Sequence, residues 1–151
     1  MYLDNATFTT VIANTPLVSI DLIVKNQHDK ILLGKRINRP AKDFWFVPGG
    51  RILKNETLSQ AFTRLSHVEL GVNFAIVNAQ LHGVYEHFYN ESVFGLIPTT
   101  HYVAIAYCLT VQDLNSLPDK QHSGFGWFSI DEILTNAFVH EHTKAYFLSK
   151  D

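Results

Sequence analysis

The chain has 151 residues, of which 12 are basic and 14 acidic, so its formal net charge at pH 7 is −2. This balance excludes the strongly basic surface that is typical of nucleic-acid-binding proteins, and no acidic tail indicates a disordered segment. With 46% hydrophobic residues, the chain is long enough to bury a substantial core, and we expect one domain over residues 1–151.

Cysteine content and the N-terminal residues bear on the cellular setting. The only cysteine, Cys108, excludes an intramolecular disulfide and lies in an apolar run, where a small core residue is expected. Residue 4 is an aspartate and no long apolar run follows, so neither a signal peptide nor a membrane-spanning segment is expected. We therefore expect a reducing, cytoplasmic setting without a membrane partner.

The first predicted element is a short helix within residues 2–14. Asp4 or Asn5 can cap its N-terminus, and Pro16 prevents the helix from continuing much further. Apolar side chains recur in this segment, and packing against the core is the role that the sequence alone favours for them. These side chains include Tyr2, Leu3 and Phe8.

Two β-rich segments follow, at residues 17–25 and 31–36. In the first, Asp21 shares a strand face with the residues two positions away. It points either to solvent, which the pattern favours, or into a site. The second segment ends in Lys35 and Arg36, and a basic pair at a strand end is usually exposed to solvent. The pair becomes relevant to function if a phosphate group needs cationic partners nearby.

Residues 45–72 are the most informative stretch, because they combine a Pro-Gly-Gly turn with one amphipathic helix over residues 57–70. At 100° per residue, Glu69 falls in the middle of the apolar stripe, in line with Phe62 and Leu65. Burying a lone carboxylate is costly unless it is paired, hydrogen-bonded or bound to a metal. The alternative is that Glu69 bends out to water near the helix end, and the helix pattern alone leaves both open.

Capping signals mark two of the predicted helices. Thr57 can cap the start of the helix over residues 57–70, and Gly71 suits the position after its end. Later in the chain, Ser129 and Glu132 have the spacing of a capping box, directly after a short predicted strand in the stretch GWFSIDEIL. The stretch VHEHTKAYFL is predicted to form a last amphipathic helix.

Residues 76–89 and 99–111 are predicted to form a hairpin, with the nearly continuous apolar second strand in the centre of a sheet. A polar loop over residues 112–124 follows, and loops of this kind can close over a substrate. His87 lies on the first strand and His122 in the loop. Taken by themselves, histidines at such positions are more often structural or solvated than catalytic.

The spacing of residues between positions 50 and 72 resembles the Nudix box, G-x5-E-x7-R-E-U-x-E-E-x-G-U, in which U is aliphatic. The matching residues are Gly50, Glu56, Arg64, Glu69, Gly71 and Val72. Leu65 and Val68 stand where the pattern has two further glutamates, and Ser66 replaces an aliphatic residue. In that family the loop and helix bind a divalent metal that holds a nucleoside diphosphate. A chain that keeps only Glu69 should bind fewer metal ions.

Further stretches along almost the whole chain resemble the GDP-mannose mannosyl hydrolases, also called GDP-sugar glycosyl hydrolases, within the Nudix superfamily. They are TPLVSIDLIV, LLGKR-x-NRPA, WFVPGGR, TTHYV, PDKQH and VH-x4-AYFL. The resemblance implies an α/β fold, the Nudix α/β/α sandwich around a mixed β-sheet, and a homodimer. It also implies hydrolysis of GDP-mannose, and of GDP-glucose, to GDP and free sugar, with water attacking the anomeric carbon with inversion.

The resemblance further implies one bound Mg²⁺, or Mn²⁺, because both metals prefer oxygen ligands. The expected ligands are the Gly49 carbonyl, Glu69 and Gln121, of which Gln121 would also contact the substrate. His122 is the expected general base, since an unperturbed imidazole pKa of ~6.5 suits proton transfer near neutral pH. Arg64 is also expected among the site residues, where it would pin the loop.

Contacts to a GDP-sugar substrate are implied for residues along the rest of the chain. Arg36 and Arg51 would neutralise charge on the departing diphosphate, and Arg36 counts as a binding residue as well. The Tyr102 hydroxyl would assist them, while Asp21 and His87 would position the sugar. The N-terminal segment would help form the guanine pocket across the dimer interface, through Tyr2, Leu3 and Phe8.

Two other functions remain open on the sequence. A conventional Nudix pyrophosphohydrolase would cut between phosphates, but Leu65 and Val68 deplete the glutamate cluster that this chemistry uses. A catalytically silent module that senses a nucleotide sugar is disfavoured by the retained site residues, which are Arg64, Glu69, Gln121 and His122. Product formation with metal present would separate a hydrolase from a sensor.

Overall fold

The computed structural model describes residues 2–112, 114 and 122–148 of the chain. These residues form helices and strands, among them the predicted strands at residues 17–25 and 31–36. The elements are α1 (Asn5–Asn14), β1 (Leu17–Lys25), β2 (Ile31–Arg36), β3 (Trp45–Phe46), β4 (Gly49–Arg51), α2 (Leu58–Leu70), η1 (Ile76–Asn78), β5 (Gln80–Tyr89), β6 (Thr100–Thr110), β7 (His122–Phe128), α3 (Ile130–Thr135), α4 (Glu141–Lys144) and η2 (Ala145–Phe147), where η marks a 3₁₀ helix.

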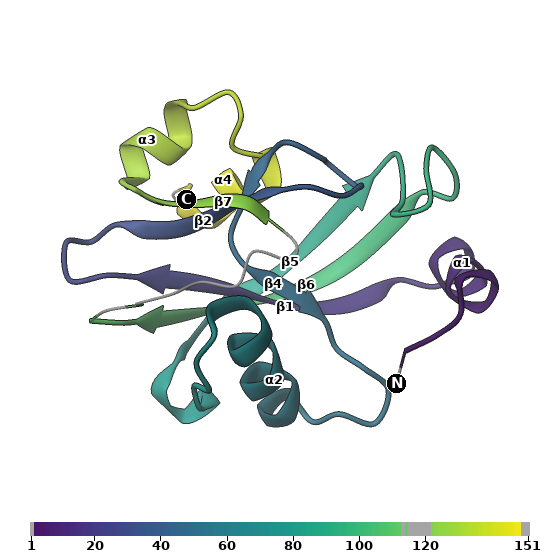
Figure 1. Ribbon diagram of the computed structural model, residues 1–151, viewed down its shortest axis with the longest axis horizontal. Helices are drawn as coiled ribbons and strands as arrows, with labels where there is room; N and C mark the ends of the chain where they lie inside the picture. Colours follow the sequence, from purple (N-terminus) through teal and green to yellow (C-terminus); the bar gives the residue numbers. More distant parts are fainter. Residues whose placement is uncertain (1, 113, 115–121, 149–151) are drawn as a thin grey trace.

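The strands form one mixed sheet between two helical layers. The order is β3-β2-β1-β6-β5, with β4 paired to β1 and β7 paired to β2. Only β1 and β6 pair in parallel among these strands, and the other pairs are antiparallel. α2 lies on one face of the sheet, and α3 and α4 lie on the other (Figure 1). The predicted α/β sandwich around a mixed sheet is therefore confirmed.

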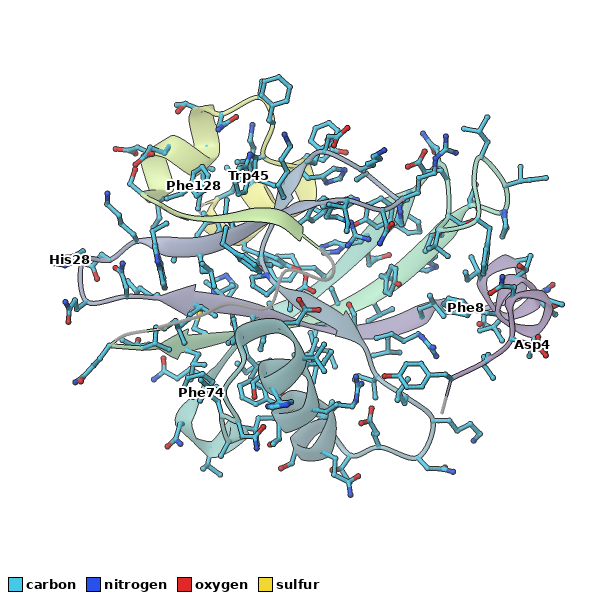
Figure 2. All side chains as sticks on the ribbon, in the orientation of Figure 1. Asp4, Phe8, His28, Trp45, Phe74 and Phe128 are labelled. Carbon is cyan, nitrogen blue, oxygen red and sulfur yellow. The ribbon has the colours of Figure 1, made fainter. Side chains whose placement is uncertain are left out.

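The hydrophobic core is divided between the two faces of the sheet, and side chains fill the space on both sides (Figure 2). The cluster on the α2 side includes Ile20, Leu22, Val24, Leu32, Ala61, Phe62, Leu65, Leu70, Tyr107, Leu109 and Val111. The cluster on the α3 and α4 side includes Ile23, Ile31, Leu33, Val47, Ala106, Ile133, Val139 and Tyr146. β1 supplies both clusters, which explains why its sequence is almost continuously apolar.

Local capping signals fix the helix boundaries where the sequence predicts them. The Asp4 side chain accepts a hydrogen bond from the Thr7 backbone amide at 2.7 Å and caps α1. Thr57 and Gln60 form a complete capping box at the start of α2. Gly71 follows α2 with φ at 77°, a left-handed conformation that favours glycine.

Four element predictions differ from the structure. The strand predicted over residues 76–89 begins only at Gln80, because Ile76–Asn78 form the 3₁₀ helix η1. The turn after β3 continues into a further short strand, β4, because it pairs with β1. The predicted strand at Gly126 begins earlier, at His122, because β7 pairs with β2 as far as Arg36. The predicted last helix is short, since α4 spans Glu141–Lys144 and passes into the 3₁₀ turn η2.

No helix in the described ranges combines the length and the apolar character that crossing a membrane requires. α1 packs near β6 and lies away from the two helical layers (Figure 1). Of its residues only Ile12 is buried. α1 is therefore anchored to the sheet by few side chains.

Candidate active site

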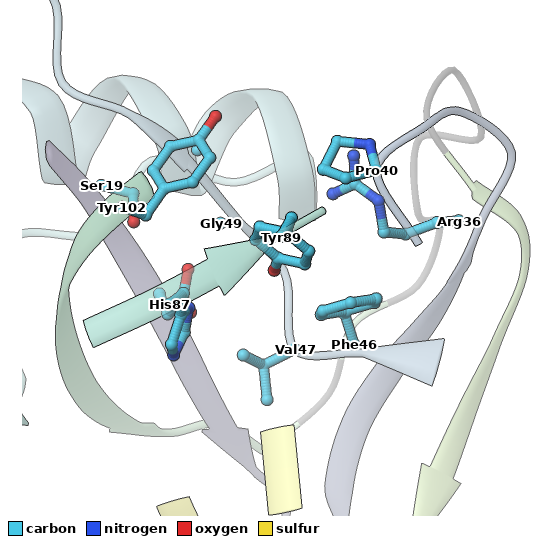
Figure 3. Close-up of a pocket in the computed structure, with 11 residues that line it drawn as sticks. Ser19, Arg36, Pro40, Phe46, Val47, Gly49, His87, Tyr89 and Tyr102 are labelled. Atoms are coloured by element: carbon cyan, nitrogen blue, oxygen red, sulfur yellow. The ribbon is translucent and has the colours of Figure 1, made fainter. Parts of the chain in front are cut away.

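One pocket opens over the middle of the sheet, and residues of β1, β2, β3, β4, β5 and β6 line it (Figure 3). Five of the sequence-predicted site residues meet in this pocket. They are Asp21, Arg36, Gly49, His87 and Tyr102. The other lining residues are Ser19, Pro40, Phe46, Val47, Gly50 and Tyr89. Strand pairing thus assembles residues that lie far apart in the sequence.

Asp21 and Gly49 are register partners across the β1–β4 pair. A Cβ atom at position 49 would stand 2.6 Å from the Ile20 carbonyl oxygen and closer still to Oδ1 of Asp21. Only glycine therefore lets β4 approach the Asp21 carboxylate this closely. The Pro-Gly-Gly turn brings the backbone at Gly49 directly to the floor of the pocket.

The Tyr146 hydroxyl, from η2, joins Asp21 to His87. It donates a hydrogen bond to Oδ2 of Asp21 and lies 3.3 Å from Nε2 of His87. Burial raises the pKa of Asp21 to about 6, opposed by this hydrogen bond and by the charge of Arg36. Burial, together with two neighbouring histidines, lowers the pKa of His87 to about 3. His87 is therefore neutral near pH 7.

A row of aromatic rings in contact runs along the pocket wall. His87 stacks on His142 with ring centroids 4.4 Å apart, and His142 lies 4.5 Å from His140. The His140 ring in turn stacks on Phe46 at 4.7 Å. The guanidinium of Arg36 lies 5.5 Å from the centroid of the Phe46 ring, close enough for a cation–π contact. This row links the two ends of the pocket through side chains of the C-terminal segment.

Arg36 supplies positive charge at the opposite side of the pocket from His87 (Figure 3). Its Nε atom is buried and has no hydrogen-bond partner among the described residues. Burial raises the pKa of the Tyr89 and Tyr102 hydroxyls, although the nearby guanidinium of Arg36 opposes the rise. Both phenols therefore remain protonated donors. A guanidinium beside protonated phenols is suited to an anionic group such as a phosphate.

A second pocket adjoins the first and shares with it Arg36, Pro40 and Tyr102. Its remaining lining residues are Phe8, Ile12, Asn38, Arg39, Val93 and Thr100. The Phe8 ring lies under the guanidinium of Arg51, 4.6 Å from it, which places Arg51 next to this pocket. α1 thereby brings an aromatic side chain to the end of the site that contains the arginines.

The N-terminal residues divide between this pocket and the surface. Phe8 lines the second pocket and packs edge to face against Phe94, with centroids 5.9 Å apart. Tyr2 is 81% exposed, so its interpretation as a core residue is wrong, because residues 2–7 face solvent apart from the half-buried Leu3. Leu3 is half-buried and lines neither of the two pockets. A guanine pocket formed across a dimer interface stays a prediction.

Arg64 binds the loop that precedes α2. Its Nε and Nη2 atoms donate to the two carboxylate oxygens of Glu56 at 2.7 and 2.9 Å. Nη2 also donates to the Arg51 carbonyl at 2.8 Å, and Glu56 accepts from the Leu53 amide at 2.8 Å. Arg64 therefore pins the loop, as the resemblance implies, and it does not line either pocket.

Glu69 is buried, with 4% of its surface exposed, so the alternative in which it bends out to water is wrong. Its charge contributes to the raised pKa of Asp21, so the two carboxylates lie near each other, but Glu69 lines neither of the two pockets. A buried carboxylate and a closely approaching backbone at Gly49 offer oxygen donors, which fit a hard divalent cation. Within residues 2–112, 114 and 122–148, no three His, Cys, Asp or Glu side chains are grouped to hold a metal.

Two predicted residues fall at the edge of what the structure describes. Gln121 lies outside the described residues. The backbone of His122 begins β7 opposite Arg36, while its side chain also lies outside the described part. The prediction that His122 lies in a loop is therefore wrong for its backbone, and its proposed role as base stays a prediction.

The sequence did not single out the C-terminal residues that complete the site. Tyr146, His140 and His142 reach the pocket wall from the last predicted helix, and Tyr89 lines the pocket itself. Among the segments that resemble the mannosyl hydrolases, the stretch VH-x4-AYFL contains His140 and Tyr146 as specified residues and His142 at one of its unspecified positions. That resemblance was the only sequence signal, because an aromatic stripe in a terminal helix ordinarily indicates core packing.

Comparison with known proteins adds a family and a fold. A family model described as the NUDIX domain matches residues 15–149. The low-salt glycan biosynthesis protein Agl8 of Haloferax volcanii is 45% identical over 113 residues, which cover 75% of this chain and 70% of that protein.

Two solved structures share the fold of the chain. The MutT NUDIX hydrolase of Burkholderia pseudomallei aligns with a TM-score of 0.72 and 24% identity, over 89% of this chain and 97% of that chain. The MutT protein of Methanosarcina mazei Go1 aligns with a TM-score of 0.71 and 19% identity, over 89% and 92% of the two chains. At these identities the two structures bear on the fold alone.

Proposed function

The chain belongs to the NUDIX family of hydrolases, and from this premise we propose that it hydrolyses GDP-mannose, and GDP-glucose, to GDP and free sugar. Water attacks the anomeric carbon with inversion, and phosphorus is not attacked. The observation that carries the proposal is the composition of one pocket, which has Arg36 at one side and His87 at the other. Asp21 also lines this pocket and is joined to His87 through the Tyr146 hydroxyl. Such a pocket suits a diphosphate joined to a sugar.

The residues that replace glutamates in α2 support attack at carbon and not at phosphorus. Leu65 is buried, and Val68 is 41% exposed on the surface of the helix. Neither can supply the carboxylates that stand at these positions in the Nudix box. Glu69 is then the only carboxylate that α2 supplies. A site with so few metal-binding carboxylates favours a reaction in which the metal assists the leaving diphosphate and the protein activates water.

The leaving group is stabilised at the end of the site that contains the arginines. Arg36 and Arg51 carry positive charge there, and the protonated Tyr102 hydroxyl can donate a hydrogen bond. As the bond between the anomeric carbon and the diphosphate oxygen lengthens, negative charge grows on that oxygen. Fixed positive charges and donors lower the energy of this state. A carboxylic acid is therefore not required to protonate the leaving group, in contrast to ordinary inverting glycosidases.

Nudix hydrolases generally use a divalent metal such as Mg²⁺ or Mn²⁺. In this chain Glu69, the Gly49 carbonyl and Gln121 would hold it, and when bound it would neutralise charge on the diphosphate. The buried position of Glu69 and the close backbone approach that Gly49 permits support the first two assignments.

His122 is the proposed general base. The pairing of β7 with β2 brings its backbone opposite Arg36, which lines the pocket, and this supports a position beside the diphosphate. Its imidazole would take a proton from the attacking water while the sugar is held by Asp21 and His87. His122→Ala should lower kcat by ~10²–10⁴-fold, the usual scale for a general base. A kcat close to that of the unchanged protein would exclude this role.

The second pocket is the proposed nucleoside site. Phe8 offers an aromatic face there, and Tyr2 and Leu3 lie on the segment that leads into α1. We propose that this segment completes a guanine pocket with a second copy of the chain in a homodimer.

The 45% identity to a glycan biosynthesis protein of Haloferax volcanii supports a sugar-nucleotide substrate. With such a soluble substrate, neither nucleic acid nor membrane is needed as a partner, and we propose a cytoplasmic location.

The test is hydrolysis of GDP-mannose with Mg²⁺ in ¹⁸O-labelled water, followed by mass spectrometry of the products. Unlabelled GDP and labelled mannose are expected, because water attacks carbon. GMP with mannose 1-phosphate would instead show a conventional pyrophosphohydrolase and overturn the proposal. Tight binding of intact GDP-mannose without product would indicate a non-catalytic sensor.

A further inference from the structure

Tyr146 is held rigidly at the junction of η2 and the sheet. Only 2% of its surface is exposed. Its backbone carbonyl lies 2.7 Å from Nε2 of His82, and its ring packs edge to face on Tyr85 with centroids 4.7 Å apart. These contacts come from β5 and fix both the backbone and the ring. These contacts therefore hold the Tyr146 hydroxyl in one position, between Asp21 and His87.

The direction of the hydrogen bonds at this hydroxyl follows from its single proton. The proton is donated to Oδ2 of Asp21. The hydroxyl can then only accept at its contact with Nε2 of His87, 3.3 Å away. His87 must therefore carry its proton on Nε2 in order to donate it. A neutral imidazole with Nε2–H has an unprotonated Nδ1, whose lone pair is an acceptor.

From this arrangement, and resting on the proposed function, we propose that Tyr146 is a positioning residue. It determines which atoms at the sugar end of the site accept hydrogen bonds from the ligand. It holds Asp21 by one oxygen and fixes His87 as the Nε2–H tautomer. The pocket then presents acceptors, Oδ1 of Asp21 and Nδ1 of His87, to the ligand. Its complement is a sugar that donates from free hydroxyl groups.

The surroundings of His87 support one fixed tautomer. Its ring stacks on His142 within 8° of parallel, so it cannot turn over without breaking that stack. Its pKa is lowered to about 3 by burial, so the doubly protonated ring is not populated near pH 7. Removing the Tyr146 hydroxyl would leave Nε2 without its acceptor, and the ring would then populate both tautomers.

The first test reads the tautomer directly, by ¹⁵N NMR of the imidazole nitrogens at pH 7.5 in the ligand-free protein. We expect His87 as the Nε2–H form in the unchanged chain and a shift toward the Nδ1–H form in Tyr146→Phe. Tyr107→Phe is the matched control, because Tyr107 is also buried but belongs to the core on the α2 side. It should leave the His87 signals unchanged. An Nδ1–H form in the unchanged chain, or identical signals in Tyr146→Phe, would overturn the proposal.

The second test reads function, through kcat and KM for GDP-mannose. Tyr146→Phe should lower kcat by about 10- to 100-fold, the scale of one or two misplaced hydrogen bonds, with KM changed much less. Substrates in which a sugar hydroxyl is replaced by hydrogen should lose less from the substitution than GDP-mannose does. Tyr107→Phe should leave both constants unchanged.

The two tests distinguish a failure of the proposed function from a failure of the inference about Tyr146. If GDP-mannose is not cleaved at carbon, the proposed function fails, while the NMR result still decides whether Tyr146 fixes the His87 tautomer. If the tautomer changes in Tyr146→Phe but kcat does not, Tyr146 has no positioning role, while hydrolysis by the unchanged protein stands. A loss of kcat without any change of tautomer would indicate a purely structural role and would also overturn the inference.

Discussion

Leu65 of α2 lies directly against Gly50 of β4: a Cβ atom built on Gly50 would stand 2.6 Å from Cδ2 of Leu65. The contact is apolar and buried, with 3% of Leu65 exposed. In the Nudix box a glutamate stands at the position of Leu65. Here the same position holds the helix against the strand. α2 therefore uses this position for packing, and its carboxylate chemistry is left to Glu69.

Gly50→Ala tests this contact through stability. The added methyl group would collide with Leu65, so we expect the free energy of unfolding to fall by about 1–3 kcal/mol, the usual cost of overpacking. Urea denaturation measures the change. Gly124→Ala in β7 is the matched control, since nothing lies within 4 Å of a Cβ atom there. An equal effect of the two substitutions would contradict the contact.

Local sequence signals are sufficient to predict those helices and strands whose boundaries are set by their own residues. The boundaries of β1 follow from a mostly apolar run that is interrupted by Ser19 and Asp21, and those of α2 follow from Thr57 and Gly71. The burial of Glu69 could be posed as one of two alternatives, because helical periodicity places it in the apolar stripe. Periodicity could not decide between them, since the outcome depends on what the sheet presents to the helix end.

The candidate site is harder to predict from the sequence than the helix and strand boundaries, because it is formed by contacts between distant segments. The strand pattern favours solvent exposure for Asp21, which instead lines the pocket because β4 and η2 approach it from later parts of the chain. Tyr146 was missed because its partners, Asp21 and His87, come from two other strands. The family resemblance does predict five of the pocket residues. The strand and helix patterns of the chain alone do not predict that these residues lie together.

Arg64→Met should destabilise the loop before α2. The substitution removes hydrogen bonds to Glu56 and to the Arg51 carbonyl. Hydrogen bonds to charged groups contribute about 1.5–3 kcal/mol each, so a loss of about this size in the free energy of unfolding is expected. Thermal or urea denaturation measures it, and Glu56→Gln in a double-mutant cycle isolates the pair.

The exposed ion pair of Lys25 and Asp29 provides the control for Arg64. Its atoms are 3.4 Å apart, but 44% and 85% of the two side chains are exposed. Lys25→Met should therefore change stability by less than ~1 kcal/mol. If Arg64→Met is no more destabilising than Lys25→Met, Arg64 does not pin the loop.

Glu69→Gln should weaken the use of metal. The substitution keeps the size of the buried side chain and removes its negative charge, which a divalent cation requires for tight binding. Loss of groups that merely support a metal ligand costs ~10–100-fold in affinity, so at least this rise is expected in the Mg²⁺ concentration for half-maximal activity. Glu132→Gln, in the cap of α3, is the control. An unchanged Mg²⁺ dependence would remove Glu69 from the ligand set.

Acid should destabilise the protein through the histidine row. Burial, with the nearby charges of His142 and Arg36, lowers the pKa of His140 to about 4. In the unfolded chain its pKa returns to ~6.5, so between these values the unfolded state binds more protons than the folded state. Stability is therefore fully present above pH ~6.5 and is lost as the pH falls toward 4. His87, with its pKa lowered to about 3, extends the loss to lower pH.

His140→Asn separates this titration from the structural role of the residue. Nδ1 of His140 accepts a hydrogen bond from the His142 amide at 3.1 Å and caps α4. Asparagine can replace it as a cap but does not titrate in this range. Between pH 4 and 6.5 the variant should take up about one proton fewer on unfolding, so its free energy of unfolding should fall less steeply with acid. Urea denaturation across this range measures both slopes, and equal slopes would show that His140 is not held neutral by the fold.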